Sequence, residues 1–204
     1  MLRDERGAAA RIRLRAGEAR MADAPGTRPA ELAALGVERW GETGFVQRCV
    51  GLLQTTSWGE EPELMSYMAP AGPRFVEFGL GREGYWLRVW PLRAFLYAWD
   101  PRAEQAVVAA LSDEHWRVRE MAAKVAASRH IGASAGPASA LLSDPVPRVR
   151  AAAARVLAQV GEAEDAAGLR RLMTDSDRAV AITAEQSLSQ LAERTDRPLD
   201  QLGQ

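Results

Sequence analysis

The chain has 204 residues, of which 47% are hydrophobic and 26% charged, and its formal net charge at pH 7 is −1. This composition is ordinary for a globular protein with its own core, and the near-neutral charge gives no overall attraction to nucleic acid or anionic membranes. Cys49 is the only cysteine, which excludes an internal disulfide and zinc clusters of several thiolates. The sequence has no apolar run of membrane-spanning length and no secretory signal, so we predict a cytoplasmic protein without membrane contact.

The N-terminal part of the chain is predicted to precede the regular structure. Residues 1–36 are expected to form a disordered arm, and the acidic residues Asp4, Glu5 and Glu18 argue against a transit peptide. Residues 37–84 are expected to form a helical N-terminal cap, with one helix around Phe45 and Cys49 and a short second helix over residues 64–68. The stretch "APAGPRFVEFGLG" that follows is broken by Gly and Pro and is left unassigned.

The C-terminal half repeats itself. A shift of 31 residues aligns three columns of matching residues, which are Asp113, Asp144 and Asp175, then Val118, Val149 and Val180, then Ala122, Ala153 and Ala184. Within a unit, apolar residues recur at helical spacing both before and after the Asp, so each unit is predicted to be a first helix, a turn and a second helix. The Asp is expected to accept hydrogen bonds from the amides at the start of the second helix.

Because one helical hairpin cannot bury its own apolar stripe, the units are expected to stack. The repeat region is predicted over residues 85–194, with a degenerate unit at 85–100 followed by three units of about 31 residues. In the degenerate unit Leu87 and Arg88 fall on the repeat columns, and Pro91 is tolerable only in the first turn of its helix. Residues 195–204 are expected to form a polar tail.

The segments "LSDPVPRVRAAAARVLAQVG", "LSDEHWRVREMAAKVAA" and, more loosely, "LMTDSDRAVAITAEQSLSQL" resemble HEAT repeats. The likeness is greatest to the short bacterial variety known as the phycobilisome-lyase HEAT-like repeat, and it covers residues 101–194. It implies an all-α fold, namely a right-handed α–α superhelix or short HEAT-like α-solenoid, here with the helical N-terminal cap. It also implies a structural ladder in which Asp and Arg side chains bridge from unit to unit.

Two columns of basic residues follow from this arrangement. The residues expected in the structural ladder are Asp113, Arg119, Asp144, Arg150, Asp175 and Arg88, with Asp113 beside Arg119 and Asp144 beside Arg150. The other group lies on the opposite flank of the second helices, which line the concave surface of HEAT-like solenoids. This candidate partner-binding stripe consists of Arg117, Lys124, Arg148, Arg155, Trp116 and Arg93. The alternative for the stripe is a solvated face, diluted by Glu114 and Glu120.

No constellation of catalytic residues is recognisable. His115 and His130 are the only histidines and have no partners at metal-ligand spacing, and "GLGREG" does not fit a dinucleotide-binding loop. Cys49 lies on the apolar face of its predicted helix and is expected to be a buried thiol. The tryptophans and other aromatics at residues 85–99 are expected to be core, whereas Trp116 is equally suited to packing and to partner contact.

We therefore expect a protein that is not an enzyme and has no cofactor, and that acts as a scaffold or binding module for another protein through its concave face. One alternative is nucleic-acid binding, because Trp116 beside Arg117 and Arg148 is similar to the basic groove of HEAT-like DNA glycosylases. The balanced charge of residues 102–194 argues against it. The other alternative is bilin-lyase or lyase-accessory activity, implied by the repeat's name alone.

Overall fold

The computed structural model describes residues 28–54, 62–68 and 84–199, and every regular element in these ranges is a helix. The longer α-helices are α2 (Pro29–Gln54), α5 (Trp86–Ala94), α7 (Trp116–Arg129), α9 (Pro147–Val160) and α11 (Arg178–Thr195). The shorter ones are α3 (Pro62–Met65), α6 (Glu104–Ala110), α8 (Ala135–Leu141) and α10 (Ala166–Leu172), and 3-10 turns precede α6, α8 and α10 at Pro101–Ala103, Gly132–Ser134 and Ala163–Asp165. Most of the predicted N-terminal arm, the stretch "APAGPRFVEFGLG" and the end of the polar tail lie outside the described residues.

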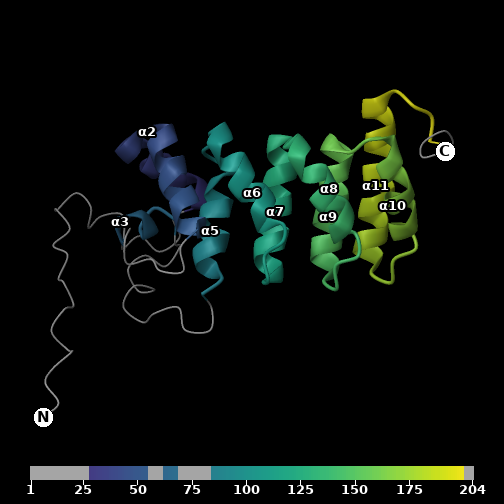
Figure 1. Ribbon diagram of the computed structural model, residues 1–204, viewed down its shortest axis with the longest axis horizontal. Coiled ribbons are helices and arrows are strands. Elements are labelled where there is room, and N and C mark those ends of the chain that lie inside the picture. The colour runs from purple at the N-terminus through teal and green to yellow at the C-terminus, as the bar shows by residue number, and fades with distance from the viewer. Residues whose placement is uncertain (1–27, 55–61, 69–83, 200–204) are drawn as a thin grey trace, which may run out of the picture.

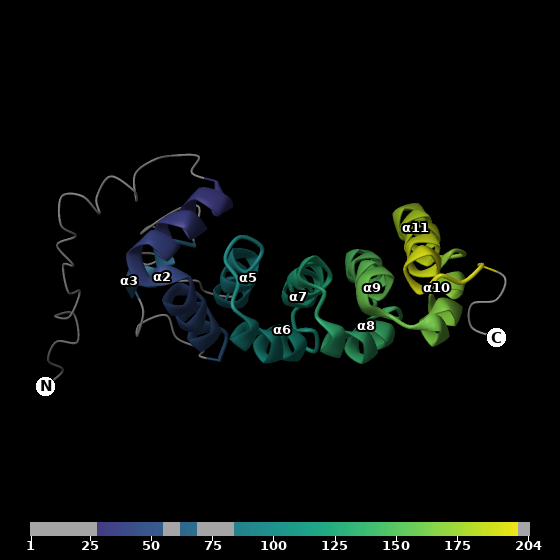
Figure 2. The same cartoon turned by 90° about the horizontal axis from the view of Figure 1, so that it is seen from above.

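The helices stack side by side into a curved array (Figure 1). Figure 2 shows α5, α7, α9 and α11 in an inner row and α6, α8 and α10 in an outer row, with the inner row on the concave side. Each second helix packs on the next, α5 on α7, α7 on α9 and α9 on α11, and each also packs on the first helix of its own unit. The all-α solenoid predicted from the 31-residue period is therefore confirmed, with the second helices lining the concave face.

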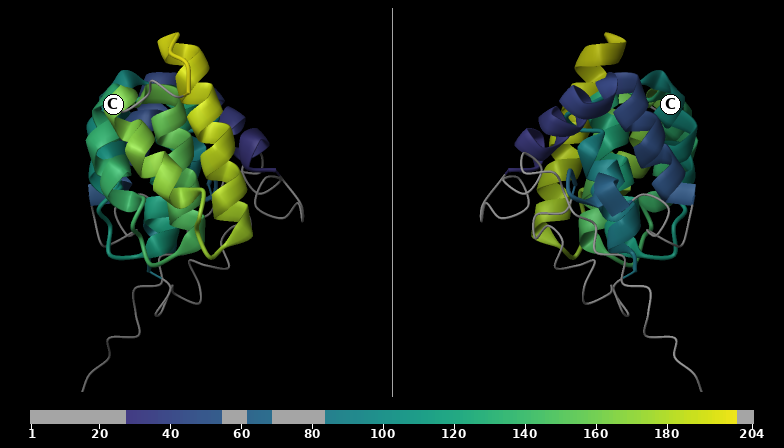
Figure 3. Two further views of the ribbon diagram at one scale, coloured as in Figure 1. Left: turned by 90° about the vertical axis from the view of Figure 1, so that its right-hand side faces the viewer. Right: turned by 90° about the vertical axis from the view of Figure 1, so that its left-hand side faces the viewer.

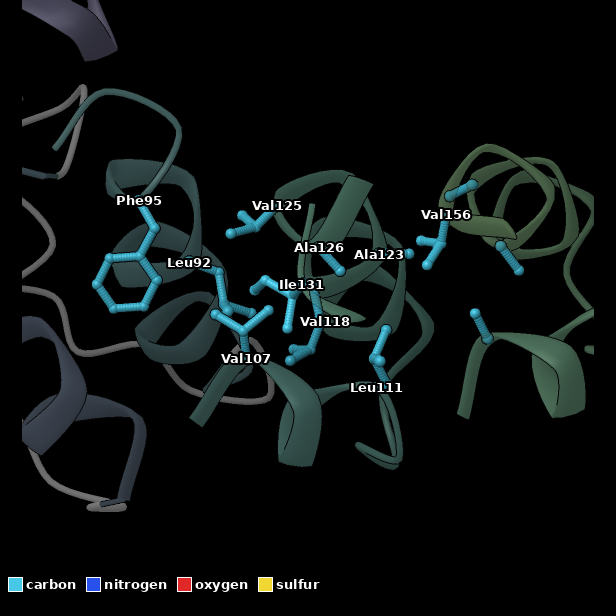
Figure 4. Packing of buried hydrophobic residues seen from close by; sticks show 14 of the residues in the cluster. Leu92, Phe95, Val107, Leu111, Val118, Ala123, Val125, Ala126, Ile131 and Val156 are labelled. Atoms are coloured by element: carbon cyan, nitrogen blue, oxygen red, sulfur yellow. The ribbon is translucent and has the colours of Figure 1, made fainter. Parts of the chain in front are cut away.

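The core is continuous along the stack because the repeat columns are buried in every unit. Val118 and Val149, and the small side chains Ala122, Ala153 and Ala184, are fully inaccessible to solvent. Alanine at these positions lets neighbouring helices approach closely, and larger side chains such as Val107, Leu111 and Ile131 fill the space between the two rows (Figure 4). The hydrophobic core thus runs between the inner and outer layers.

Each second helix begins after a turn that its Asp side chain closes. The Oδ1 atoms of Asp113, Asp144 and Asp175 each accept a hydrogen bond at 2.8 Å from the amide of the residue two positions later. The amide that is bound belongs to the residue that precedes the helix, so the Asp fixes the turn and does not cap the helix itself. In the last unit a separate residue, Asp177, caps α11 by accepting from the amides of Ala179 and Val180.

The N-terminal helix begins earlier than the sequence indicated. Helix α2 begins at Pro29, so the predicted boundary between arm and cap at residue 37 is wrong. Leu32 and Ala33 of this first part are buried, and the Glu31 side chain accepts a hydrogen bond of 3.0 Å from the Arg28 amide at the helix start. These apolar contacts hold residues 29–36 in the helix.

Helix α2 also supplies the first helix of the degenerate unit. It bends at Gly41, whose φ of 72° lies in the region that favours glycine, and its second half runs in the outer row beside α6 (Figure 2). This half packs on α5, and Glu42 accepts a hydrogen bond of 3.0 Å from the Trp99 amide. The unit that we predicted from residues 85–100 alone is thus a hairpin of α2 and α5.

Helix α5 is shorter than the helices that follow it. It has nine residues, whereas α7 and α9 have fourteen, and Pro91 lies in its second turn. A proline there removes one backbone hydrogen bond, which is consistent with the early end of the helix. The two ends of the stack are formed by α2 and by α10 with α11 (Figure 3).

Candidate functional site

Three Arg–Asp pairs form a ladder along the stack. Arg88 Nε lies 2.6 Å from Asp113 Oδ2, Arg119 Nε lies 2.8 Å from Asp144 Oδ2, and Arg150 Nε lies 2.7 Å from Asp175 Oδ2. In every pair the arginine comes from a second helix and the aspartate from the turn of the next unit. The ladder therefore joins four successive second helices through charge-assisted hydrogen bonds.

The pairing differs by one unit from the pairing that we predicted. The Arg119 carboxylate partner is Asp144, and its contact with Asp113 is a hydrogen bond of 2.8 Å from Nη1 to the backbone carbonyl oxygen. Arg150 repeats the arrangement, with Asp175 as its carboxylate partner and the Asp144 carbonyl as its second acceptor. Each guanidinium thus binds the backbone of the turn in its own unit and the carboxylate of the turn in the next unit. The expected side-chain pairs of Asp113 with Arg119 and of Asp144 with Arg150 are therefore wrong.

The ladder is structural, because its charged side chains are largely buried and form hydrogen bonds with one another and with the backbone. The side chains of Arg119 and Asp144 are only 14% and 3% exposed. The hydrogen bond from Arg150 lowers the pKa of Asp175, and the bond to Asp175 in turn raises the pKa of Arg150. Groups held in this way are not available to a ligand.

Acid is expected to weaken the last rung of this ladder. The folded-state pKa of Asp175 lies below the ordinary value of 3.8, so the stabilisation from its pair with Arg150 is present above pH 3.8 and is lost as the pH falls below it. We expect Asp175→Asn to be less stable than the wild type at neutral pH, with a difference that shrinks in acid. Urea denaturation at a series of pH values measures the difference in the free energy of unfolding. A difference that does not change with pH would contradict this prediction.

On the concave face, tryptophan and arginine side chains alternate from α5 to α9. The guanidinium carbon of Arg117 lies 5.5 Å from the Trp86 ring centroid and 4.6 Å from that of Trp116. Arg148, from the next helix, lies 5.6 Å from the same Trp116 ring. We call Trp86, Arg117, Trp116 and Arg148 the aromatic–arginine stack. Cation–π contacts of this kind hold the guanidinium groups in place while the side chains stay partly exposed.

A buried carboxylate lies beside the stack. Glu120 Oε1 is 2.8 Å from Lys124 Nζ and 3.0 Å from Arg148 Nη2, although Glu120 itself is buried. From the sequence, Glu120 is expected only to dilute the positive charge of the stripe. Its burial could have been inferred from its position in the repeat, since the residues 31 positions before and after it are the apolar Val89 and Ala151.

A groove of about 520 Å³ extends from this point between α7, α9 and α11. Its basic side chains are Lys124, Arg148 and Arg155, and Ala151 and Val180 contribute apolar surface. Arg155 donates a hydrogen bond of 3.4 Å to Thr183 Oγ1. Among the residues that the structure describes, neither Arg117 nor Arg155 has a carboxylate partner.

Arg93 lies apart from the other members of the predicted stripe. Its Nη2 atom donates a hydrogen bond of 3.0 Å to the Met68 carbonyl oxygen, and burial lowers its pKa. The guanidinium therefore ties α5 to the segment that follows α3. We correct the prediction for Arg93 and assign it a structural contact, while Trp116, Arg117, Lys124, Arg148 and Arg155 lie together on the concave face.

The aromatic residues before the first full repeat divide between core and surface. Trp90 and Phe95 are buried, as expected, whereas Tyr97 is exposed and Trp86 belongs to the aromatic–arginine stack. Trp99 is partly buried beneath the guanidinium of Arg129, 5.4 Å from its ring centroid. The expectation that the whole cluster is core is thus wrong for Tyr97, whereas Trp86 and Trp99 pack against the core while partly exposed.

His115 takes part in the start of α7. Its ring stacks on Tyr85 with 3.6 Å between centroids, and its Nδ1 atom accepts a hydrogen bond of 3.3 Å from the Arg117 amide. Burial lowers the pKa of His115, and the charge of Arg117 acts in the same direction. The neutral ring that results is the form that accepts this bond.

The remaining reactive side chains have structural surroundings. The thiol of Cys49 is buried and lies 3.5 Å from Met68 Sδ, as its position on an apolar helix face predicted. In the part of the chain that the structure describes, no three His, Cys, Asp or Glu residues are grouped as metal ligands. None of the helices in the described ranges is both long and apolar enough to cross a membrane.

Stacked helical hairpins, the Arg–Asp ladder and a concave inner row define an α-solenoid. Residues 105–189 match the family model of HEAT repeats, a range that begins in α6 and ends in α11. The resemblance to HEAT repeats is thereby confirmed for these units, while α2 and α5 lie outside the match. No curated protein matches the chain.

Proposed function

We propose that the protein is a binding module or scaffold that docks another protein on its concave face and has no catalytic role of its own. The aromatic–arginine stack carries this proposal, because large aromatic side chains and arginines are the residues that most often dominate binding energy at protein interfaces. HEAT repeats commonly mediate protein interactions, which supports the same role.

The shape of the site supports docking of a macromolecule. The inner row presents side chains from three successive helices, and the ladder fixes the positions of these helices relative to one another. A surface that is ordered before binding loses little conformational entropy when a partner arrives. The groove next to the stack extends this surface toward α11.

The test is affinity capture from cell lysate, with and without nuclease treatment. The bait variant combines Trp116→Ala, Arg117→Gln and Arg155→Gln, which removes the aromatic anchor and two arginines of the site that have no carboxylate partner within residues 28–54, 62–68 and 84–199. Arg148 and Lys124 are kept, because Glu120 is buried between them and needs both. We expect the wild type to retain a protein that the triple variant loses.

The control variant removes two exposed arginines elsewhere, through Arg171→Gln and Arg197→Gln, and thus matches the change in charge. Thermal unfolding followed by circular dichroism establishes that both variants fold. Equal capture by all three baits would place the interface elsewhere. Capture that disappears after nuclease treatment would favour nucleic acid as the ligand instead.

A further inference from the structure

We infer that the concave face recognises an extended acidic segment of its partner, with carboxylates held by Arg117, Arg148 and Arg155. This inference rests on the proposed function and assigns the chemistry of the partner. The evidence is the placement of three guanidinium groups on two successive helices, their contacts with Trp116 and Thr183, and the carboxylates already engaged beside them.

The aromatic–arginine stack positions two guanidinium groups so that they can bind an anion. Arg117 and Arg148 both lie over the Trp116 ring, at 4.6 Å and 5.6 Å from its centroid. A guanidinium that is stacked by its flat face keeps its N–H donors directed outward in its own plane, where a carboxylate can take two of them. Because the rings restrict these long side chains before binding, less rotamer entropy is lost on contact.

The groove is lined by more basic than acidic side chains. Lys124, Arg148 and Arg155 line it together with two carboxylates, Glu120 and Asp177. Both carboxylates are already engaged, Glu120 with Lys124 and Arg148, and Asp177 with the first amides of α11. The Arg148 side chain is nevertheless 61% exposed, so it can bind an external carboxylate in addition to Glu120.

The spacing of the arginines matches an extended chain. Arg117 and Arg148 occupy the same register on neighbouring helices, and packed helices lie about 8–10 Å apart. Arg155 follows Arg148 by two helical turns, which corresponds to about 10 Å along α9. An extended peptide in the polyproline II conformation has three residues per turn and advances about 9 Å per turn, so acidic side chains at every third position lie on one face at about the spacing of neighbouring arginines.

Nucleic acid fits these observations less well. Binding to duplex DNA relies on many phosphate contacts, and the charge of the whole chain is near neutral. The groove also contains the buried carboxylate of Glu120, which a dense row of phosphates would meet at close range. A sparse row of carboxylates avoids that repulsion.

The test is fluorescence anisotropy with a labelled peptide that carries glutamate at every third position between glycine and serine. The comparison peptide has glutamine in place of each glutamate. We expect the glutamate peptide to bind the full chain at low salt, and the glutamine peptide to bind at least about tenfold more weakly. Arg117→Gln and Arg155→Gln should each weaken binding by about threefold to tenfold, while Arg171→Gln leaves it unchanged.

Three results distinguish failure of this inference from failure of the proposed function. If the triple variant loses its captured protein but the two peptides bind equally, or neither binds, the concave site is correct and the acidic class is wrong. If duplex DNA binds more tightly than the glutamate peptide and is lost in the same variants, the ligand is nucleic acid. If capture is unaffected by the triple variant, the proposed function itself fails.

Discussion

Replacing Asp144 by alanine is expected to lower the free energy of unfolding by about 3–4 kcal/mol. Asp144 is the acceptor for Arg119 Nε at 2.8 Å and for the Val146 amide at 2.8 Å, and its side chain is almost completely covered. The substitution leaves a partly buried guanidinium without a carboxylate and removes the bond that closes the turn before α9. Urea denaturation measures the change.

The matched control is an ion pair outside the ladder whose arginine is exposed. Arg102 and Asp100 are 3.5 Å apart and the Arg102 side chain is largely exposed, so Arg102→Ala should cost less than about 1 kcal/mol. Asp144→Asn keeps the size of the side chain and should fall between the two. If Asp144→Ala costs no more than Arg102→Ala, the ladder does not hold the stack together.

Replacing Glu120 by glutamine is expected to change stability and binding in opposite directions. The substitution removes the buried negative charge that Lys124 and Arg148 share, and we expect it to lower the free energy of unfolding by about 1–2 kcal/mol. The same change frees both cations for an external carboxylate. The affinity for the glutamate peptide should therefore rise by about threefold.

The comparison for this prediction is Glu185→Gln, which neutralises an exposed carboxylate on α11. It should leave both stability and peptide affinity nearly unchanged. Circular dichroism and anisotropy on the same preparations give the two quantities. Weaker peptide binding by Glu120→Gln at unchanged stability would contradict the role that we assign to Glu120.

The sequence was sufficient for the repeat architecture because the period is carried by residues that the core needs. Val118 and Ala122 recur in each unit at positions that face neighbouring helices, and both are fully buried. These features depend on local periodicity and on the need to bury an apolar stripe, which a sequence displays directly.

The register of the ladder and the extent of the first unit could not be obtained in this way. The pairing of Arg119 with Asp144 depends on how far one helix is displaced relative to the next, and the repeat columns are compatible with either neighbour. The first helix of the degenerate unit is separated from α5 by a long insertion. Its role follows only from the packing of α2 against α5.

The candidate stripe was predicted in part. The helical spacing correctly grouped Trp116, Arg117 and Arg148, because Arg117 and Arg148 fall at matching positions of adjacent helices and Trp116 precedes Arg117. It could not show that Arg93 turns toward Met68, or that Glu120 is buried between two cations. Both facts depend on which neighbours a side chain meets, and those neighbours come from other units.

The most direct test of the concave face as a docking surface is a binding isotherm with the purified captured protein. The measurement compares the wild type, the triple variant Trp116→Ala, Arg117→Gln and Arg155→Gln, and the control variant Arg171→Gln and Arg197→Gln. We expect the triple variant to bind at least about tenfold more weakly, and the control variant to bind like the wild type. Equal affinities for all three proteins would contradict the account.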